Sequence, residues 1–154
     1  MNLTGTFTFN GPRDVVWDLL QDPVVLAKVL PGTERLTQAG EDRYEGVMKV
    51  SIGPMTAAVF TATVTLQDKV APERYTMLID AKGNVGFARG SAAVQLTAQP
   101  DGGTLMEYTS DVHVGGRIAS VGQRLLDSVA KMMMRQALEA LNKELCARLD
   151  ARNT

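Results

Sequence analysis

The stretch DVHVGGRIASVGQRLLDSVAKMMMRQALEALNKEL, residues 111–145, decides the fold of this chain. It begins as the end of a strand, passes two glycines and continues as a long helical pattern of apolar and charged residues. The three consecutive methionines 132–134 sweep roughly 200° of a helix surface, because neighbouring helical residues lie about 100° apart. One buried face cannot hold all three, so we expect the helix to make apolar contacts on two sides.

The first apolar stripe of this helix is predicted to face a sheet. Gly122 lies in this stripe, and a glycine inside a helix costs roughly 1 kcal/mol relative to alanine. Either the backbone there closely approaches the sheet or a ligand, or the glycine is a tolerated defect. Gln136 either bonds to a backbone carbonyl or offers its amide to a bound molecule. Counted from Ile118, the stripe contains Ile118, Val121, Gly122, Leu125, Val129, Met132, Met133, Gln136 and Ala140.

A second apolar stripe runs along the opposite side of the same helix. It either packs against short N-terminal helices, through Val16, Leu20 or Val25, or forms a partner surface. Because those helices offer few apolar residues, we expect the distal part, Leu145 and Leu149 above all, to stay partly exposed. A homodimer, the membrane surface or a partner enzyme would cover it, although interleaved acids argue against strong attraction to anionic lipid. The stripe consists of Met134, Leu138, Leu141, Leu145 and Leu149.

The residues before this helix predict a sheet of seven strands. Residues 3–9 alternate between apolar and polar, as a half-buried strand does. Pro12 is predicted to begin a short helix that ends at Leu20, and Asp22 to cap a second one that ends by 30–32. Short turns between the later strands imply antiparallel pairing. Those strands are predicted at 33–38, 43–52, 55–68, 73–82, 87–99 and 104–114.

The expected fold class is therefore α+β, with a curved antiparallel sheet around a long C-terminal helix and two short helices after the first strand. Residues 1–154 form one domain. Several positions on the apolar face of the sheet are small, among them Ala62 and Ala92. Either the strands curl closely onto the helix, or a cavity remains between them. The cavity walls are predicted to include Phe60, Met77, Tyr108, Gly122, Leu125, Val129, Met133 and Gln136.

Groups that could carry chemistry are scarce. The formal net charge is −1, which does not suggest a nucleic-acid partner. One cysteine, Cys146, and one histidine, the outward-facing His113, cannot make a zinc site. The predicted cavity holds no carboxylate or histidine for acid–base or triad catalysis. We therefore expect no enzyme activity, metal or cofactor. The chain lacks a signal peptide pattern and an apolar run that could span a bilayer, which predicts a soluble cytoplasmic domain.

The order of elements resembles the helix-grip fold of START-like lipid-transfer and polyketide-cyclase-like proteins, the SRPBCC superfamily. Four segments, 22–32, 44–55, 86–96 and 115–133, look like the CoxG family of carbon monoxide dehydrogenase subunits. The last of these, GGRIASVGQRLLDSVAKMM, is the most specific. Members of that family occur with aerobic molybdenum hydroxylases and are thought to help recruit these enzymes to the cytoplasmic membrane.

The resemblance implies a non-catalytic module that binds a hydrophobic molecule, such as a quinone, an isoprenoid or a lipid. It also implies a molybdenum hydroxylase partner and peripheral association with the inner face of the membrane. The alternative is an assembly or recruitment factor that acts through surface protein contacts and holds no ligand. A small enzyme of the cyclase or hydratase type is a third interpretation, which the apolar cavity walls disfavour.

Overall fold

The computed structural model describes residues 1–153 and contains one seven-stranded sheet, three α-helices and a short 3-10 helix among them. Most strand ends lie within two residues of the predicted ones. The elements are β1 (Asn2–Phe9), α1 (Arg13–Leu19), α2 (Pro23–Val29), β2 (Thr33–Gly40), β3 (Arg43–Ile52), β4 (Met55–Val70), β5 (Arg74–Gly83), β6 (Gly86–Ala98), β7 (Thr104–Gly115), η1 (Arg117–Val121) and α3 (Gln123–Arg152).

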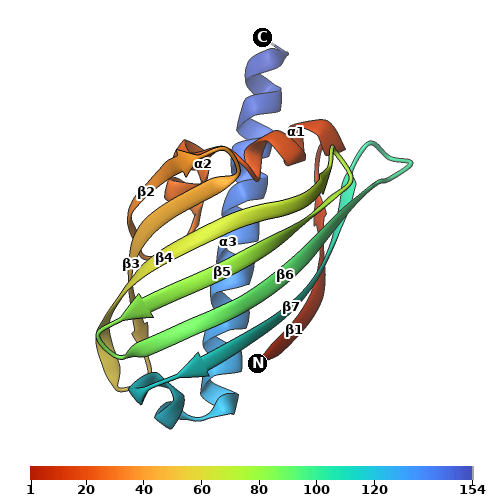
Figure 1. The fold of residues 1–154 in the computed structure, drawn as a ribbon. Coiled ribbons are helices and arrows are strands. Elements are labelled where there is room, and N and C mark those ends of the chain that lie inside the picture. Colours follow the sequence, from red (N-terminus) through yellow and green to blue (C-terminus); the bar gives the residue numbers. More distant parts are fainter. Residues whose placement is uncertain (154) are drawn as a thin grey trace.

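The sheet is antiparallel throughout and has the order β1-β7-β6-β5-β4-β3-β2. It curves around α3, which runs along the concave side (Figure 1). The α1 and α2 helices lie at one end of the sheet, beside the C-terminal half of α3, and η1 lies at the other end (Figure 1). This arrangement confirms the predicted α+β fold.

The two short helices have different starts. Asp22 caps α2 as predicted, because its carboxylate accepts hydrogen bonds from the backbone nitrogens of Val24 and Val25. Pro12 does not begin α1 as its first helical residue. It is the N-cap in extended conformation, and its carbonyl oxygen accepts from the nitrogens of Val15 and Val16. The fixed φ of proline suits both positions, so the difference is one residue.

The long helix begins later than the pattern predicted. Residues 117–121 form η1, and Gly122 then turns the chain with φ +98° and ψ 149°. Only glycine adopts such a conformation readily. The prediction that Gly122 lies inside a helix, close to the sheet or a ligand, is wrong, because a Cβ atom there would meet nothing within 4 Å. The glycine is needed for the turn into α3.

This break changes the phase of α3, and its buried face lies between the two predicted stripes. The face is made of Leu126, Ala137, Leu138, Leu141 and Leu145. Two members of the first stripe, Met132 and Gln136, are exposed, so their predicted orientation toward the sheet is wrong. The predicted phase is counted from Ile118, which belongs to η1 and not to α3.

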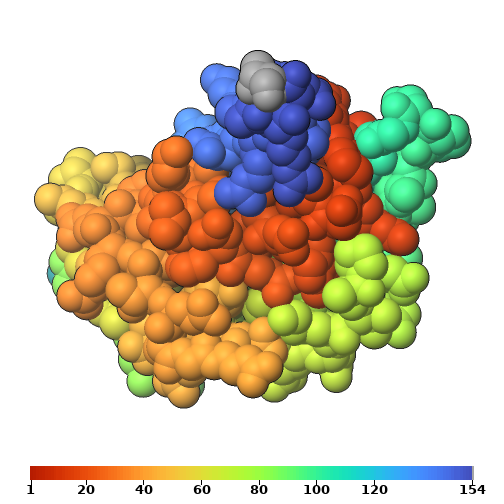
Figure 2. Space-filling view, turned by 90° about the horizontal axis from the view of Figure 1, so that it is seen from above, coloured from red at the N-terminus to blue at the C-terminus, as the bar shows by residue number. Residues whose placement is uncertain are grey.

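The predicted partner surface is also wrong for most of its residues. Leu138, Leu141 and Leu145 are buried, and Leu145 has no exposed surface at all. Met134 and Leu149 are partly buried and pack against the same core. The reason is that α1 and α2 close over this half of α3 with Val15, Val16, Leu19, Val25 and Val29. Figure 2 looks onto this end, where α1 and α2, in red to orange, pack beside the last turns of α3, in blue.

The apolar core divides into two clusters along α3. The larger cluster joins α1, α2 and the C-terminal half of α3 to the sheet. The smaller one joins Ile118 and Leu126 to Ile52, Ala58 and Phe60 at the other end. A single helix thus contacts one sheet at two places, and the space beside each contact forms the candidate site.

Candidate ligand-binding site

The first cavity lies between the sheet, α2 and the middle of α3, and we call it the upper cavity. Its volume is about 220 Å³. The strand residues reach it by strict alternation, as Tyr75 and Met77 do on β5 and Met106, Tyr108 and Ser110 on β7. The remaining walls are Leu20, Leu26, Val29, Leu30, Leu36, Tyr44, Val64, Leu66, Ala92, Val94, Met134, Ala137, Leu138 and Leu141.

The second cavity lies nearer η1, and we call it the lower cavity. It also has a volume of about 220 Å³ and apolar walls. Four alanines, at positions 62, 81, 88 and 130, leave the space that larger side chains would fill. The other walls are Met1, Met48, Val50, Ile52, Phe60, Val114, Ile118, Leu126, Val129 and Met133.

One row of residues on the sheet separates the two cavities. Ile79 pairs with Gly90, and Gly90 pairs with Val112, across β5, β6 and β7. On each strand the residues two positions before and after this row line one cavity or the other. Because residues two apart on a strand are separated by about 7 Å, the partition is a single row thick. Its middle member is a glycine, so it contributes no side chain.

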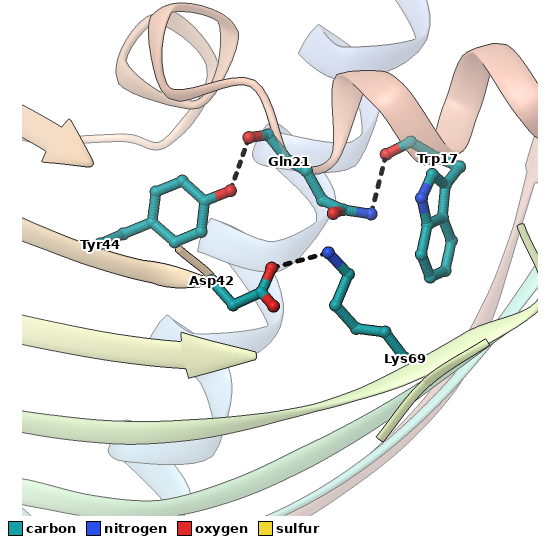
Figure 3. A network of polar contacts seen from close by, with 5 residues as sticks. All are labelled: Trp17, Gln21, Asp42, Tyr44 and Lys69. Carbon is teal, nitrogen blue, oxygen red and sulfur yellow. Dashed lines mark hydrogen bonds and ion pairs between the residues drawn. The ribbon is translucent and has the colours of Figure 1, made fainter. Parts of the chain in front are cut away.

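A small polar network closes the upper cavity where α1 leads into α2. The Tyr44 hydroxyl donates to the backbone oxygen of Gln21 at 2.6 Å, and the Gln21 amide donates to the oxygen of Trp17 at 3.4 Å (Figure 3). Lys69 and Asp42 form an ion pair of 2.6 Å beside them. These bonds fix the start of α2 against β3.

The tyrosines around this network are held neutral. Burial raises the pKa of Tyr44, and the carboxylates of Asp42 and Asp22 add to that effect. Burial raises the pKa of Tyr75 further, with a smaller contribution from Tyr44. The ring of Tyr75 packs edge-on against Trp17 with 5.5 Å between centroids. The upper cavity therefore ends in a packed aromatic wall and not in a charged group.

The predicted site residues fall into three groups. Met77 and Tyr108 line the upper cavity, whereas Phe60, Val129 and Met133 line the lower one. Gly122, Leu125 and Gln136 line neither. Gly122 and Gln136 are exposed, and Leu125 packs its Cδ2 against Gly53 in the β3–β4 turn. The single predicted cavity is thus two cavities, and the shifted phase of α3 explains the three misplaced residues.

Several wall residues were missed in the sequence. Leu26 and Leu30 come from α2 and its end, and Leu36 comes from the edge strand β2. The apolar spacing of 26 and 30 on a short helix was the available signal, because residues four apart share a helix face. Leu126 and Ala130 replace Leu125 on α3 for the reason of phase given above.

A further hollow of about 290 Å³ lies on the outer face of the sheet. It is bordered by Asp68, Arg74, Gln95 and Glu107, so its walls are charged and polar. It does not suit an apolar molecule and is not continuous with either cavity wall on α3.

The chemistry available inside the two cavities is limited to apolar contact and tyrosine hydroxyls. Tyr44, Tyr75 and Tyr108 are the titratable side chains in the walls. His113 is exposed on the outer face of β7, beside the ring of Phe87. Among residues 1–153, no group of three or more His, Cys, Asp or Glu side chains is arranged to hold a metal ion. In the same part of the chain, no helix is both long and apolar enough to cross a membrane.

The family model of the carbon monoxide dehydrogenase subunits named CoxG matches residues 5–146 of this sequence. The chain belongs to the CoxG family. None of the curated proteins compared with it matches this CoxG chain in sequence. A solved structure of a conserved protein from Geobacillus kaustophilus is 30% identical over 96% of both chains, with a TM-score of 0.90.

More distant structures share the fold of this CoxG domain. The Zhui aromatase/cyclase from Streptomyces is 16% identical over 97% of this chain and 95% of its own, with a TM-score of 0.72. A START superfamily protein from Mycobacterium smegmatis is 10% identical over 93% of this chain and 95% of its own, with a TM-score of 0.68. The fold is therefore the START-like helix-grip fold. Because it houses an aromatase/cyclase as well, the fold by itself does not decide between binding and catalysis.

Proposed function

We propose that this domain binds one elongated apolar molecule, a quinone, an isoprenoid or another lipid, in its two cavities. The observation that carries the proposal is the alignment of the two apolar cavities along α3, with one row of residues between them. Ligand pockets in proteins usually measure roughly 300–1,000 Å³. Each cavity alone is smaller than that, but the two together reach the range. A long thin molecule suits such a pair better than a compact one.

The methionines support an apolar chain as the ligand. Met77, Met106 and Met134 line the upper cavity, while Met48 and Met133 line the lower one. Methionine side chains are flexible and polarisable, so they adapt to guests of different shape. Met133 and Met134 are neighbours on α3 and contribute to different cavities. Rotation of these two side chains is the simplest way to join the cavities around one guest.

The domain acts in this proposal as a carrier and not as an enzyme. Tyrosine hydroxyls with raised pKa values are poor general bases near neutral pH. Membership of the CoxG family supports a molybdenum hydroxylase of the carbon monoxide dehydrogenase type as the partner that uses the bound molecule. A recruitment factor without a ligand is the alternative. The helix stripe that had suggested such a role is internal, so no surface observation favours it.

The first test is to identify what the purified protein carries. Native mass spectrometry and organic extraction of the protein should reveal a stoichiometric apolar molecule. After delipidation, the protein should bind an isoprenoid quinone, measured by quenching of the fluorescence of Trp17, which borders the upper cavity through Tyr75. A delipidated protein that folds and binds no quinone, isoprenoid or lipid would refute the proposal.

A further inference from the structure

Basic and apolar residues alternate in a regular way on the outward side of η1 and the first half of α3. The pairs Arg117-Ile118, Arg124-Leu125 and Lys131-Met132 recur every seven residues. Seven residues are close to two helical turns, so within α3 the cations and the apolar side chains form two adjacent rows. Arg117, Arg124 and Lys131 are exposed, Leu125 is half-buried, and Met132 is 43% exposed.

The same part of the chain carries a local excess of positive charge. Residues 115–138 hold four basic side chains, with Arg135 as the fourth, and one acid, Asp127, for a net charge of +3. Residues 1–114 carry nine basic and 13 acidic side chains, a net charge of −4. None of the four cations forms an ion pair among residues 1–153. Asp127 accepts a hydrogen bond of 2.8 Å from the Gln123 amide instead.

The second half of α3 differs in this respect. Residues 139–154 hold three bases and three acids. Two of these six are paired with α2 or its cap, since Glu144 binds Lys28 at 2.8 Å and Arg148 binds Asp22 at 3.7 Å. The interleaved acids that argued against attraction to lipid are therefore mainly in this half. The first half keeps its cations free.

We propose that the outward side of η1 and the first half of α3 binds the surface of an anionic lipid bilayer. We call this surface the basic face, and it comprises Arg117, Val121, Arg124, Leu125, Lys131, Met132 and Arg135. Anionic lipid attracts clustered lysines and arginines, while exposed apolar side chains beside them enter the boundary between headgroups and acyl chains. A second copy of the chain would present the same positive charge and repel this face. The negative remainder of the domain orients away from the bilayer.

The basic face lies on the same turns of α3 as the wall of the lower cavity. Val129 and Met133 line that cavity, and Lys131 and Met132 lie between them in the chain. Binding to a bilayer through this face holds the lower cavity next to the phase in which apolar molecules dissolve. Membrane binding does not depend on the cavity being filled, so it goes beyond the proposed carrier function.

Sedimentation with vesicles tests the basic face. The protein should bind vesicles of phosphatidylcholine mixed equally with phosphatidylglycerol, and should bind vesicles of phosphatidylcholine alone far less. One lysine or arginine close to anionic lipid contributes about a fivefold gain in affinity. Arg124→Glu with Lys131→Glu should therefore weaken binding by well over about tenfold. High salt should have the same effect on the unchanged protein, because the attraction is screened.

The matched control reverses two other exposed cations on the same helix. Lys143→Glu with Arg152→Glu changes the net charge equally but lies outside the basic face. This control should keep most of the binding. Equal losses in both double variants would overturn the proposal, as would failure of the unchanged protein to prefer anionic vesicles. Binding of an isoprenoid quinone in detergent is measured in parallel. If that binding persists while vesicle binding is absent, the basic face is refuted and the carrier function stands.

Discussion

Gly11 lies directly against Leu145. A Cβ atom at position 11 would come within 3.0 Å of Cδ2 of Leu145 and 2.7 Å of Cδ1 of Leu149. Leu145 has no exposed surface, and the loop between β1 and α1 covers it. Contacts this close leave no room for a partner protein between them. The last turns of α3 therefore belong to the core of the domain.

Shortening Leu145 should destabilise the protein strongly. Leu145→Ala is expected to lower the free energy of unfolding by about 2–5 kcal/mol, because it leaves a cavity in a packed region. Leu145→Glu should prevent folding, since it buries a charge without a partner. Urea denaturation measures both effects. Met132→Ala, at an exposed position of the same helix, should change stability by less than about 0.5 kcal/mol. A Leu145→Glu protein that melts normally but loses self-association would restore the idea of a docking surface.

The strands were predictable because their signals are local. Alternation placed Met77 and Tyr108 on the concave face, and the register confirms that these positions line the upper cavity. The cap at Asp22 was predictable for the same reason, because its hydrogen bonds reach only two and three residues along the chain. Features that depend on neighbouring residues were thus available without the fold.

The face of α3 was not predictable because it depends on one torsion angle and on distant packing. A glycine can continue a helix at a small cost or end one, and the sequence does not distinguish the two. Here Gly122 ends η1, and the phase counted from Ile118 no longer applies to α3. The burial of Leu145 further requires α1 to dock on α3 across more than a hundred residues of sequence. The division of the site into two cavities has the same origin.

Replacing Gly122 should affect stability and not ligand binding. Gly122→Ala forces a side chain into a backbone conformation that residues other than glycine rarely adopt, at a cost of about 1–3 kcal/mol. The new methyl group meets no atom within 4 Å, so it does not enter a cavity. Thermal and urea denaturation measure the loss, with Ala119→Ser as a control at an exposed neighbouring position. Weaker quinone binding at unchanged stability would instead return Gly122 to a cavity wall.

Stability should fall at alkaline pH because of Tyr75. Burial raises the pKa of this hydroxyl in the folded protein, whereas the unfolded chain ionises near the ordinary value of 10.0. The stabilisation is complete below pH 10 and is lost progressively as the pH rises above it, because only the unfolded state then releases the proton. Free energies of unfolding measured from about pH 8 to about pH 11 should therefore decrease at the upper end. Tyr75→Phe should reduce that decrease, and an unchanged pH profile in this variant would assign the loss to other groups.

Filling either cavity should prevent an elongated ligand from binding. Ala137→Leu adds three carbon atoms to the wall of the upper cavity, and Ala130→Leu adds them to the lower one. If one molecule occupies both cavities, either variant should weaken binding of a long isoprenoid quinone by roughly fivefold to a hundredfold, as expected for 1–3 kcal/mol of overpacking. A short quinone without a tail fits one cavity and should be affected by only one of the two variants. Ala147→Leu, at an exposed position of α3, controls for the substitution itself. If both variants fold and neither changes the affinity for the long quinone, the ligand does not occupy these cavities.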